Sequence, residues 1–173
     1  MEQNLLILGA GIYGLVVKEL ADSTGQFQKI AFVDDGAKTA PDGTAVAGTT
    51  KELPALAGEY THAVVAIGNP EVRRKLVELI EKTPALQLAT LVSPKAYVSP
   101  SAKLGTGCVV EPMAVVHAGC TLGNSCLICA GAVINHGACC GDFVQVDCNV
   151  TLCGFAQVPD GSKLAAGSVY VKK

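Results

Sequence analysis

Residues 92–169 repeat every six positions without a shift in phase. Thirteen successive hexads fit one register, from VSPKAY at the start to LAAGSV at the end. The first position holds Val, Leu or Ile in twelve hexads and Cys140 in the other, and the fifth position always holds Ala, Cys, Ser or Val. A period sustained over this length is typical of solenoids, in which each repeat packs only on its neighbours.

The hexad predicts a short strand followed by a turn. The fifth position of one hexad and the first position of the next are two residues apart, so their side chains share one face of a strand. Both faces inward, and the second to fourth positions are often Gly, Pro, Asn or Asp, as turns require. Three strands and three turns close one triangular coil, so the repeat predicts a parallel β-helix of a little over four coils.

The same register places half of the eight cysteines in the interior of the coils. Cys108, Cys120 and Cys126 occupy the fifth position and Cys140 the first, while the register gives no role to the other four. Cys126 and Cys129 form one C-x2-C pair without a second pair at finger-like spacing, so we predict no metal site. The N-terminus lacks the features of a secretion signal, which favours reduced thiols over disulfides.

Residues 1–91 predict a separate α/β domain. Apolar runs favour strands in NLLILGAG, KIAFVDD, HAVVAIGN and LATLVSP, and helical spacing favours helices in IYGLVVKELADST and PEVRRKLVELIEKT. The stretch GAKTAPDGTAVAGTT reads as a loop. This order indicates a small, mostly parallel, Rossmann-like sheet at residues 1–91, followed by the β-helix at residues 92–173.

Composition excludes several classes of protein. The net charge is −2 and there is no basic tract, so a nucleic-acid partner is not expected. No apolar run is long enough to cross a membrane, and the N-terminus does not read as a signal peptide. We therefore expect a cytoplasmic protein that does not bind membranes.

A glycine-rich turn connects the first predicted strand to the first predicted helix. Gly9, Gly11 and Gly14 follow the G-x-G-x-x-G spacing, and Asp34 stands twenty residues after Gly14. In this arrangement glycines let the backbone approach a phosphate, and the acidic residue binds ribose hydroxyls. About 90 residues are too few for both halves of a dinucleotide-binding domain, which favours one nucleotide over NAD. The alternative is that the glycines only shape tight turns.

His136 occupies the third position of its hexad, so it lies in a turn and points away from the core. Core packing is therefore not expected, and two interpretations stay open. Neutral imidazole is suited to act as a general base near neutral pH. The other interpretation is an ordinary turn histidine facing solvent.

The whole chain resembles one family of hexapeptide-repeat acyltransferases, the sialic-acid O-acetyltransferases (NeuD-like) and UDP-amino-sugar N-acetyltransferases (PglD-like). The resemblance is carried by LILGAGIYGLVV, FVDD and AIGNPEVRRKL in the first half and by GAVINHGACCGDFVQV in the second. It implies a left-handed β-helix, acetyl-CoA as co-substrate, a sugar-nucleotide or sialic-acid-like acceptor, and no metal. It also implies a homotrimer with active sites between subunits.

The resemblance implies roles for particular residues. His136 is the general base, and Gly154 directs a backbone N–H at the thioester oxygen. Gln145, Gly154 and Ala166 contact acetyl-CoA. The residues implied to bind the sugar nucleotide follow the strands of the first domain: Gly9, Gly11, Gly14, Asp34, Asp35, Gly68 and Asn69. Tyr13, within the glycine turn, is a further candidate for the sugar nucleotide, with helix packing as the alternative. Lys172 and Lys173 are candidates for the CoA phosphates, with solvated terminal lysines as the alternative.

The chain also departs from the family pattern. Gly137 replaces the acidic residue that commonly follows the histidine, and Gln145 replaces a second histidine. Only four residues follow Val169, where relatives commonly add another coil. These departures support an alternative, a trimeric sugar-nucleotide-binding or scaffold protein whose catalysis has decayed. The sequence identifies neither the acceptor sugar, nor the acyl chain, nor whether nitrogen or oxygen is acylated.

Overall fold

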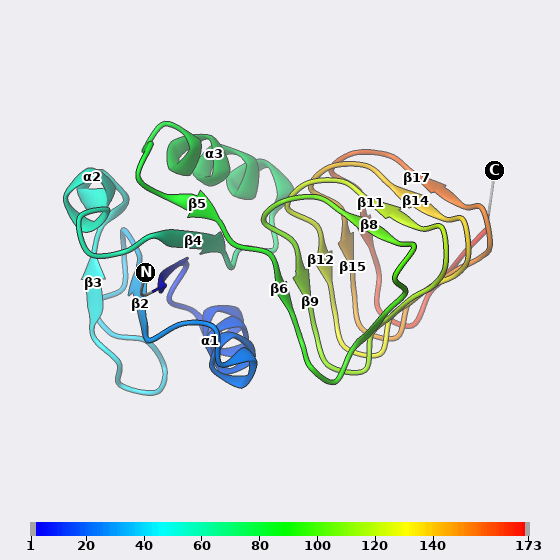
Figure 1. The fold of residues 1–173 in the computed structure, drawn as a ribbon, viewed down its shortest axis with the longest axis horizontal. Coiled ribbons are helices and arrows are strands. Elements are labelled where there is room, and N and C mark those ends of the chain that lie inside the picture. Colours follow the sequence, from blue (N-terminus) through cyan, green and yellow to red (C-terminus); the bar gives the residue numbers. More distant parts are fainter. Residues whose placement is uncertain (1–2, 172–173) are drawn as a thin grey trace. The chain divides into compact units, whose positions relative to one another are not determined.

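The structure, a computed structural model, describes residues 3–171 and divides into two compact units. The first unit ends at Ala89 and the second begins at Thr90 (Figure 1). The sequence places the boundary two residues later, between residues 91 and 92. Across residues 3–171, no helix combines the length and the apolar character needed to cross a membrane.

The first unit contains one parallel sheet of five strands in the order β3-β2-β1-β4-β5. Buried apolar side chains of the three central strands fill its core, which is why these strands read as continuous hydrophobic runs. The strands are β1 (Asn4–Leu8), β2 (Lys29–Val33), β3 (Val46–Gly48), β4 (His62–Val65) and β5 (Gln87–Leu88).

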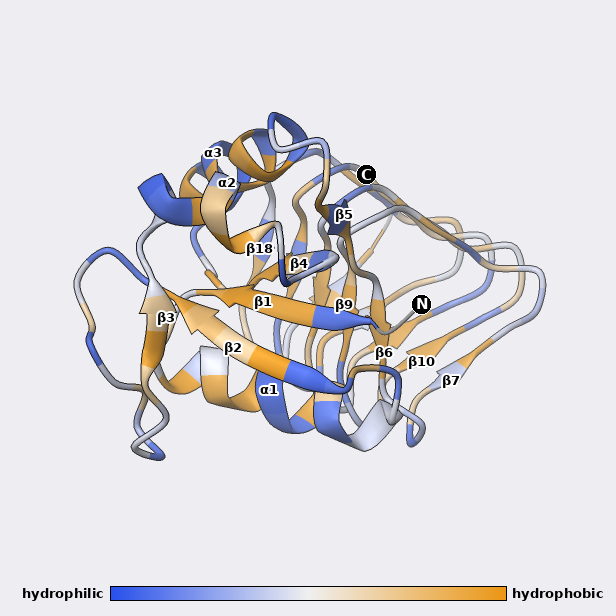
Figure 2. Ribbon diagram, turned by 60° about the vertical axis from the view of Figure 1, so that its left-hand side comes forward, coloured by the Kyte–Doolittle hydropathy of each residue, from blue (hydrophilic) through white to orange (hydrophobic). Residues whose placement is uncertain are grey.

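Helices cover both faces of this sheet. Figure 2 shows α1 (Ile12–Thr24) on one side and α2 (Leu53–Leu56) with α3 (Pro70–Glu81) on the other. Helix α1 ends at Gly25, whose φ of 64° is the left-handed conformation that favours glycine at this position. Helix α3 begins with Pro70, and the Asn69 side chain accepts hydrogen bonds from the Glu71 and Val72 amides.

Two short strands differ from the sequence-based prediction. Strand β3 and the single-turn helix η1 (Thr50–Glu52) occupy a stretch that begins in the predicted loop, because pairing with β2 at the sheet edge outweighs its Gly- and Thr-rich composition. The last strand of the first unit, β5, comes earlier than expected. The predicted strand LATLVSP instead contains β6 (Leu91–Val92), which pairs with β9 of the second unit.

The second unit is a parallel β-helix whose coils contain 18 residues, since Val133 pairs with Thr151 and 151 − 133 = 18. Three hexads therefore make one coil, as predicted.

Strands of successive coils lie side by side in three sheets (Figure 1). The first sheet has β7 (Tyr97–Val98), β10 (Val115–Val116), β13 (Val133–Ile134), β16 (Thr151–Leu152) and β19 (Val169–Tyr170). The second has β8 (Lys103–Leu104), β11 (Thr121–Leu122), β14 (Cys139–Cys140) and β17 (Gln157–Val158). The third has β6, β9 (Val109–Val110), β12 (Leu127–Ile128), β15 (Gln145–Val146) and β18 (Lys163–Leu164).

The interior of the coils consists of side chains from the first and fifth hexad positions, which confirms the inward face predicted from the period. Cys108, Cys120, Cys126 and Cys140 belong to this core. All eight cysteines are free thiols.

The fourth hexad position has a conformation that the sequence did not reveal. Backbone φ there is positive both at glycines, such as Gly137 at 66°, and at larger residues, such as Phe143 at 59° and Phe155 at 61°. The left-handed conformation costs little energy for glycine but strains a residue with a bulky side chain. The turns from Gly107 to Gly167 therefore adopt this conformation whichever residue occupies the fourth position, whereas Lys95 and Ser101 in the first two hexads do not.

Candidate functional site

The predicted nucleotide-binding residues gather at one edge of the first sheet. The strand order reverses between β1 and β4, and in open α/β sheets ligands bind outside the carboxyl ends of the strands at such a switch point. Gly9 and Gly11 follow β1, Asp34 follows β2, and Gly68 follows β4. The topology thus brings together the residues that the glycine motif and the family resemblance indicated.

The three glycines of the motif have different physical reasons to be glycine. A Cβ on Gly14 would lie 2.1 Å from the Gly9 carbonyl oxygen, so only glycine fits where the helix packs on the turn. Gly9 has a φ of 112°, and its Cβ would lie 2.8 Å from Cδ1 of Ile67. Gly11, the N-cap of α1, has open space around it. Gly9 and Gly14 therefore shape the turn, while Gly11 leaves room for a ligand at the helix N-terminus.

Asp34 ties the glycine turn to the end of β2. Its Oδ2 accepts from the Ala10 amide at 2.9 Å, and its Oδ1 accepts from the Gly36 and Ala37 amides at 2.8 Å each. Burial alone would raise the pKa of this carboxyl, but these three N–H groups outweigh burial and hold the pKa below its ordinary value. A carboxylate oxygen can accept a second hydrogen bond, so the ribose-binding role stays a prediction.

Replacing Asp34 with Asn should lower the thermal unfolding midpoint at pH 7. The folded-state pKa lies below the ordinary value of 3.8, so the carboxylate stabilises the fold above that pH, and this contribution disappears as pH falls through the folded-state pKa. The difference in midpoint between the two proteins should therefore shrink below about pH 4. Glu19→Gln on the exposed face of α1 is the matched control, and a difference independent of pH would contradict the prediction.

The remaining residues at this edge also make contacts within the fold. Asp35 accepts hydrogen bonds from the Thr50 amide and hydroxyl at 2.8–2.9 Å. Tyr13 lies half-buried in the first turn of α1. Arg73 is fully buried, and its Nη1 donates to the carbonyls of Ile67 and Gly68 at 2.8 and 3.0 Å. The guanidinium thus supports the loop that precedes Asn69.

Replacing Arg73 with Met should lower the free energy of unfolding by about 2–3 kcal/mol, because hydrogen bonds from a charged donor contribute roughly 1.5–3 kcal/mol. Met keeps the length of the side chain but leaves the two loop carbonyls without this donor. Denaturant unfolding measures the change, with Lys75→Met on the exposed face of the same helix as control. Equal stability of the two variants would show that Arg73 does not support the loop.

His136 is exposed at the corner that follows β13, and its ring is held by the residue before it. Asn135 Oδ1 lies 2.8 Å from His136 Nδ1 and accepts from the His136 backbone amide at 2.9 Å. Two N–H groups converge on one atom, which identifies that atom as the amide oxygen and Nδ1 as the protonated nitrogen. In the neutral ring Nε2 then has a free lone pair, the state that a general base requires.

The next coil completes the surroundings of the imidazole. A Cβ on Gly154 would lie 2.8 Å from His136 Nε2, so this nitrogen lies directly over the Gly154 backbone. Phe155 meets the His136 ring edge to face, with ring centroids 5.2 Å apart. A Cβ on Gly137 would lie 2.6 Å from the Phe155 ring. Gly137 is therefore explained both by its positive φ and by the aromatic ring that fills the adjacent space.

Neither of two other candidates has a recorded contact with the His136 ring. Asp142, the nearest acid in sequence, accepts from the Asn124 amide at the corner that follows β14, so this bond joins two coils. His117 is exposed at the His136 corner, one coil earlier, where its amide donates to the Ile134 carbonyl. Asn135 is thus the polar side chain that holds the imidazole, which also packs against Phe155.

The predicted acetyl-CoA contacts fall on two sides of the β-helix. Gly154 lies at the His136 corner, whereas Gln145 lies in β15 and Ala166 at the corner after β18. Gln145 is half a coil from His136, since 145 − 136 = 9 and a coil has 18 residues. Its buried Oε1 has no hydrogen-bond partner among residues 3–171. Lys172 and Lys173 lie outside the described residues.

Sequence reasoning missed two members of the His136 site. Asn135 had no assigned role, although an Asn directly before a turn residue is a frequent backbone-binding pattern. Phe155 stands 18 residues after Gly137, so the coil length, once applied to the turn positions, would have placed the two side by side.

An α/β domain with a switch-point glycine turn, joined to a β-helix with an exposed histidine, defines a two-domain class of hexapeptide-repeat proteins. The sequence matches the family model "PglD N-terminal domain" over residues 4–80. The chain is 30% identical to the acetyltransferase domain of PglB from Neisseria gonorrhoeae FA1090, with a TM-score of 0.89 over 99% of this chain and 93% of that chain. It therefore belongs to the PglD-like family of hexapeptide-repeat acetyltransferases, and its coils form a left-handed parallel β-helix.

Further relatives agree with this assignment. The chain is 32% identical over 111 residues to UDP-N-acetylbacillosamine N-acetyltransferase of Bacillus subtilis, a match that covers 62% of this chain and 50% of that protein. The PglB domain has also been solved in complex with acetyl coenzyme A, at 30% identity, a TM-score of 0.84 and coverage of 99% and 94%. PerB from Caulobacter crescentus, in complex with CoA and GDP-perosamine, is 25% identical with a TM-score of 0.71, covering 96% of this chain and 91% of that chain.

Proposed function

We propose that this protein transfers an acetyl group from acetyl-CoA to the amine of an amino sugar nucleotide. The observation that carries the proposal is the His136 site, where Asn135 holds Nδ1 and leaves Nε2 free over Gly154. Relatives support the co-substrate and the acceptor class, because the PglB domain binds acetyl coenzyme A and PerB binds CoA and GDP-perosamine. The B. subtilis relative is an N-acetyltransferase, which favours N-acetylation.

In the proposed reaction the amine nitrogen attacks the thioester carbonyl carbon. Nε2 of His136 accepts the proton that the amine loses, the C–S bond breaks, and the proton passes to the departing CoA sulfur. The Gly154 N–H stabilises the oxygen anion of the tetrahedral intermediate, a contribution of about 2.7–4 kcal/mol for one such donor. The switch-point edge of the first domain holds the nucleotide phosphates on backbone amides.

The proposed active form is a homotrimer with each site between two subunits. His136 and Gln145 lie on different sides of one β-helix, so a site that contains both must take them from two copies. The unpartnered Oε1 of Gln145 is consistent with a contact supplied from outside the chain. Light scattering should give three times the chain mass of 17.7 kDa, and full activity of a monomer would contradict this arrangement.

Release of free CoA across a panel of acceptors tests the proposed activity. The panel pairs UDP- and GDP-linked amino sugars with the same nucleotides linked to sugars that carry hydroxyl in place of amine, and adds free sialic acid. We expect CoA release with amino sugar nucleotides only. Release with sialic acid alone would redirect the proposal to O-acetylation, and absence of both CoA release and micromolar acetyl-CoA binding would favour the decayed scaffold.

A further inference from the structure

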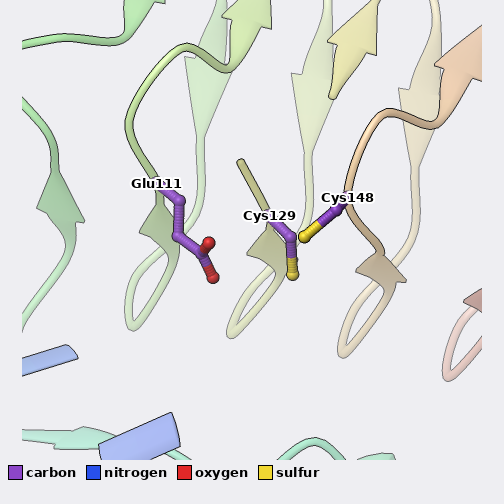
Figure 3. A group of neighbouring side chains, drawn as sticks. All are labelled: Glu111, Cys129 and Cys148. Carbon is purple, nitrogen blue, oxygen red and sulfur yellow. The ribbon is translucent and has the colours of Figure 1, made fainter. Parts of the chain in front are cut away.

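Three side chains from successive coils converge at the corner of the β-helix that follows its third sheet, one strand before the His136 corner. Glu111 follows β9, Cys129 follows β12 and Cys148 follows β15 by one more residue. One carboxylate oxygen and the two sulfur atoms all lie within 4.8 Å of one another. Figure 3 shows Cys129 between Glu111 and Cys148, with the Cys148 sulfur pointing toward Cys129.

The buried carboxylate of Glu111 is hydrogen-bonded at only one of its two oxygens. The residue is 6% exposed, and its Oε2 accepts from the Ala130 amide at 3.0 Å. Its Oε1 is buried and has no hydrogen-bond partner among residues 3–171. A buried carboxylate oxygen without a partner is costly, so it indicates a ligand that the oxygen contacts when the site is filled.

The chemistry of the donors identifies the class of ligand. Two sulfurs and one carboxylate oxygen match soft to borderline divalent ions and not magnesium or calcium, which take oxygen ligands. Zinc binds sulfur at about 2.3 Å and carboxylate oxygen at about 2.0–2.2 Å in a tetrahedron, which places its ligands roughly 3.5–3.8 Å apart. Because the three atoms lie within 4.8 Å of one another, the side chains would have to close by at most about 1 Å, within the range of small χ adjustments.

We propose that Glu111, Cys129 and Cys148 bind one zinc ion, with the fourth position taken by water or a further oxygen ligand. The ion would join three consecutive coils at one corner, so its effect is to stabilise the β-helix. The sequence concealed this site because its ligands come from three coils, separated by 18 and 19 residues. The visible C-x2-C pair is misleading, since Cys126 belongs to the core.

Zinc titration of the reduced, chelator-treated full chain tests the proposal. We expect one zinc per chain by elemental analysis and a rise in the unfolding midpoint that increases with zinc concentration, as linkage requires. Magnesium should produce no shift. Glu111→Gln and Cys148→Ser should each weaken zinc affinity at least tenfold, whereas Cys139→Ser, a partly exposed thiol in β14, should leave it unchanged.

The proposal would be overturned if the wild-type chain retained no zinc, or if Cys148→Ser bound zinc with wild-type affinity. It would also be overturned if Cys139→Ser lost as much zinc affinity as Cys148→Ser, because zinc would then be bound by scattered surface thiols. Circular dichroism of the metal-free variants checks that they fold, and Glu111→Gln tests the site without removing a thiol. Because acyl transfer is assayed separately, a failed zinc test leaves the proposed activity unaffected.

Discussion

Replacing His136 with Ala should lower kcat about 10²–10⁴-fold, the usual contribution of a general base. The side chain is exposed and belongs to no core contact, so the free energy of unfolding should change by about 0.5 kcal/mol or less. Acetyl-CoA affinity should also persist, because the imidazole is proposed to act on the acceptor amine. The measurement is steady-state CoA release together with calorimetric binding of acetyl-CoA.

His117→Ala is the matched control for this experiment. His117 is exposed at the same corner one coil earlier, so its removal tests for a general effect of histidine on this surface. We expect the control to keep wild-type kcat. Wild-type kcat in His136→Ala would refute the assignment of His136 as the base. Equal losses of kcat in His136→Ala and His117→Ala would show that this corner contributes to substrate binding and not to proton transfer.

The β-helix was predictable because its pattern is repeated many times. Each hexad independently assigns the same positions to the interior, so Val116, Cys126 and Ala156 could be placed without knowledge of long-range contacts. Strand β3 could not, because three residues with mixed exposure give too short a pattern and depend on pairing with β2. The left-handed fourth position was hidden for a similar reason, since it is occupied by Phe143 and Phe155 as well as by glycine.

The candidate site was predictable where a motif or the coil length defines it. The family motif indicated His136 and Gly154, and a separation of one coil brings them together. The orientation of the imidazole was not predictable, because it depends on the rotamers of Asn135 and Phe155. For Asp34 the motif predicted a role but not the contacts. It indicates a residue that binds ribose, whereas the structure shows the carboxylate accepting three hydrogen bonds from backbone amides.

The Gly154→Ala variant should retain its fold and lose most of its activity. The new Cβ would lie 2.8 Å from Nε2 and 3.0 Å from Cε1 of His136, closer than van der Waals contact permits. The imidazole is exposed at the end of a side chain, so it moves aside and the coil is preserved. Displacement of the base and blocked access to Nε2 should lower kcat/KM by about 10²-fold, as small misplacements of catalytic groups do.

Two measurements separate this effect from general damage to the coil. The unfolding midpoint of Gly154→Ala should stay close to that of Gly58→Ala, a control glycine whose Cβ would make only ordinary contact with Ala55. The losses in Gly154→Ala and His136→Ala should not add in the double variant, because both remove the same proton transfer. Full additivity would mean that Gly154 acts independently of the imidazole, and wild-type kcat/KM in Gly154→Ala would place the acceptor away from Nε2.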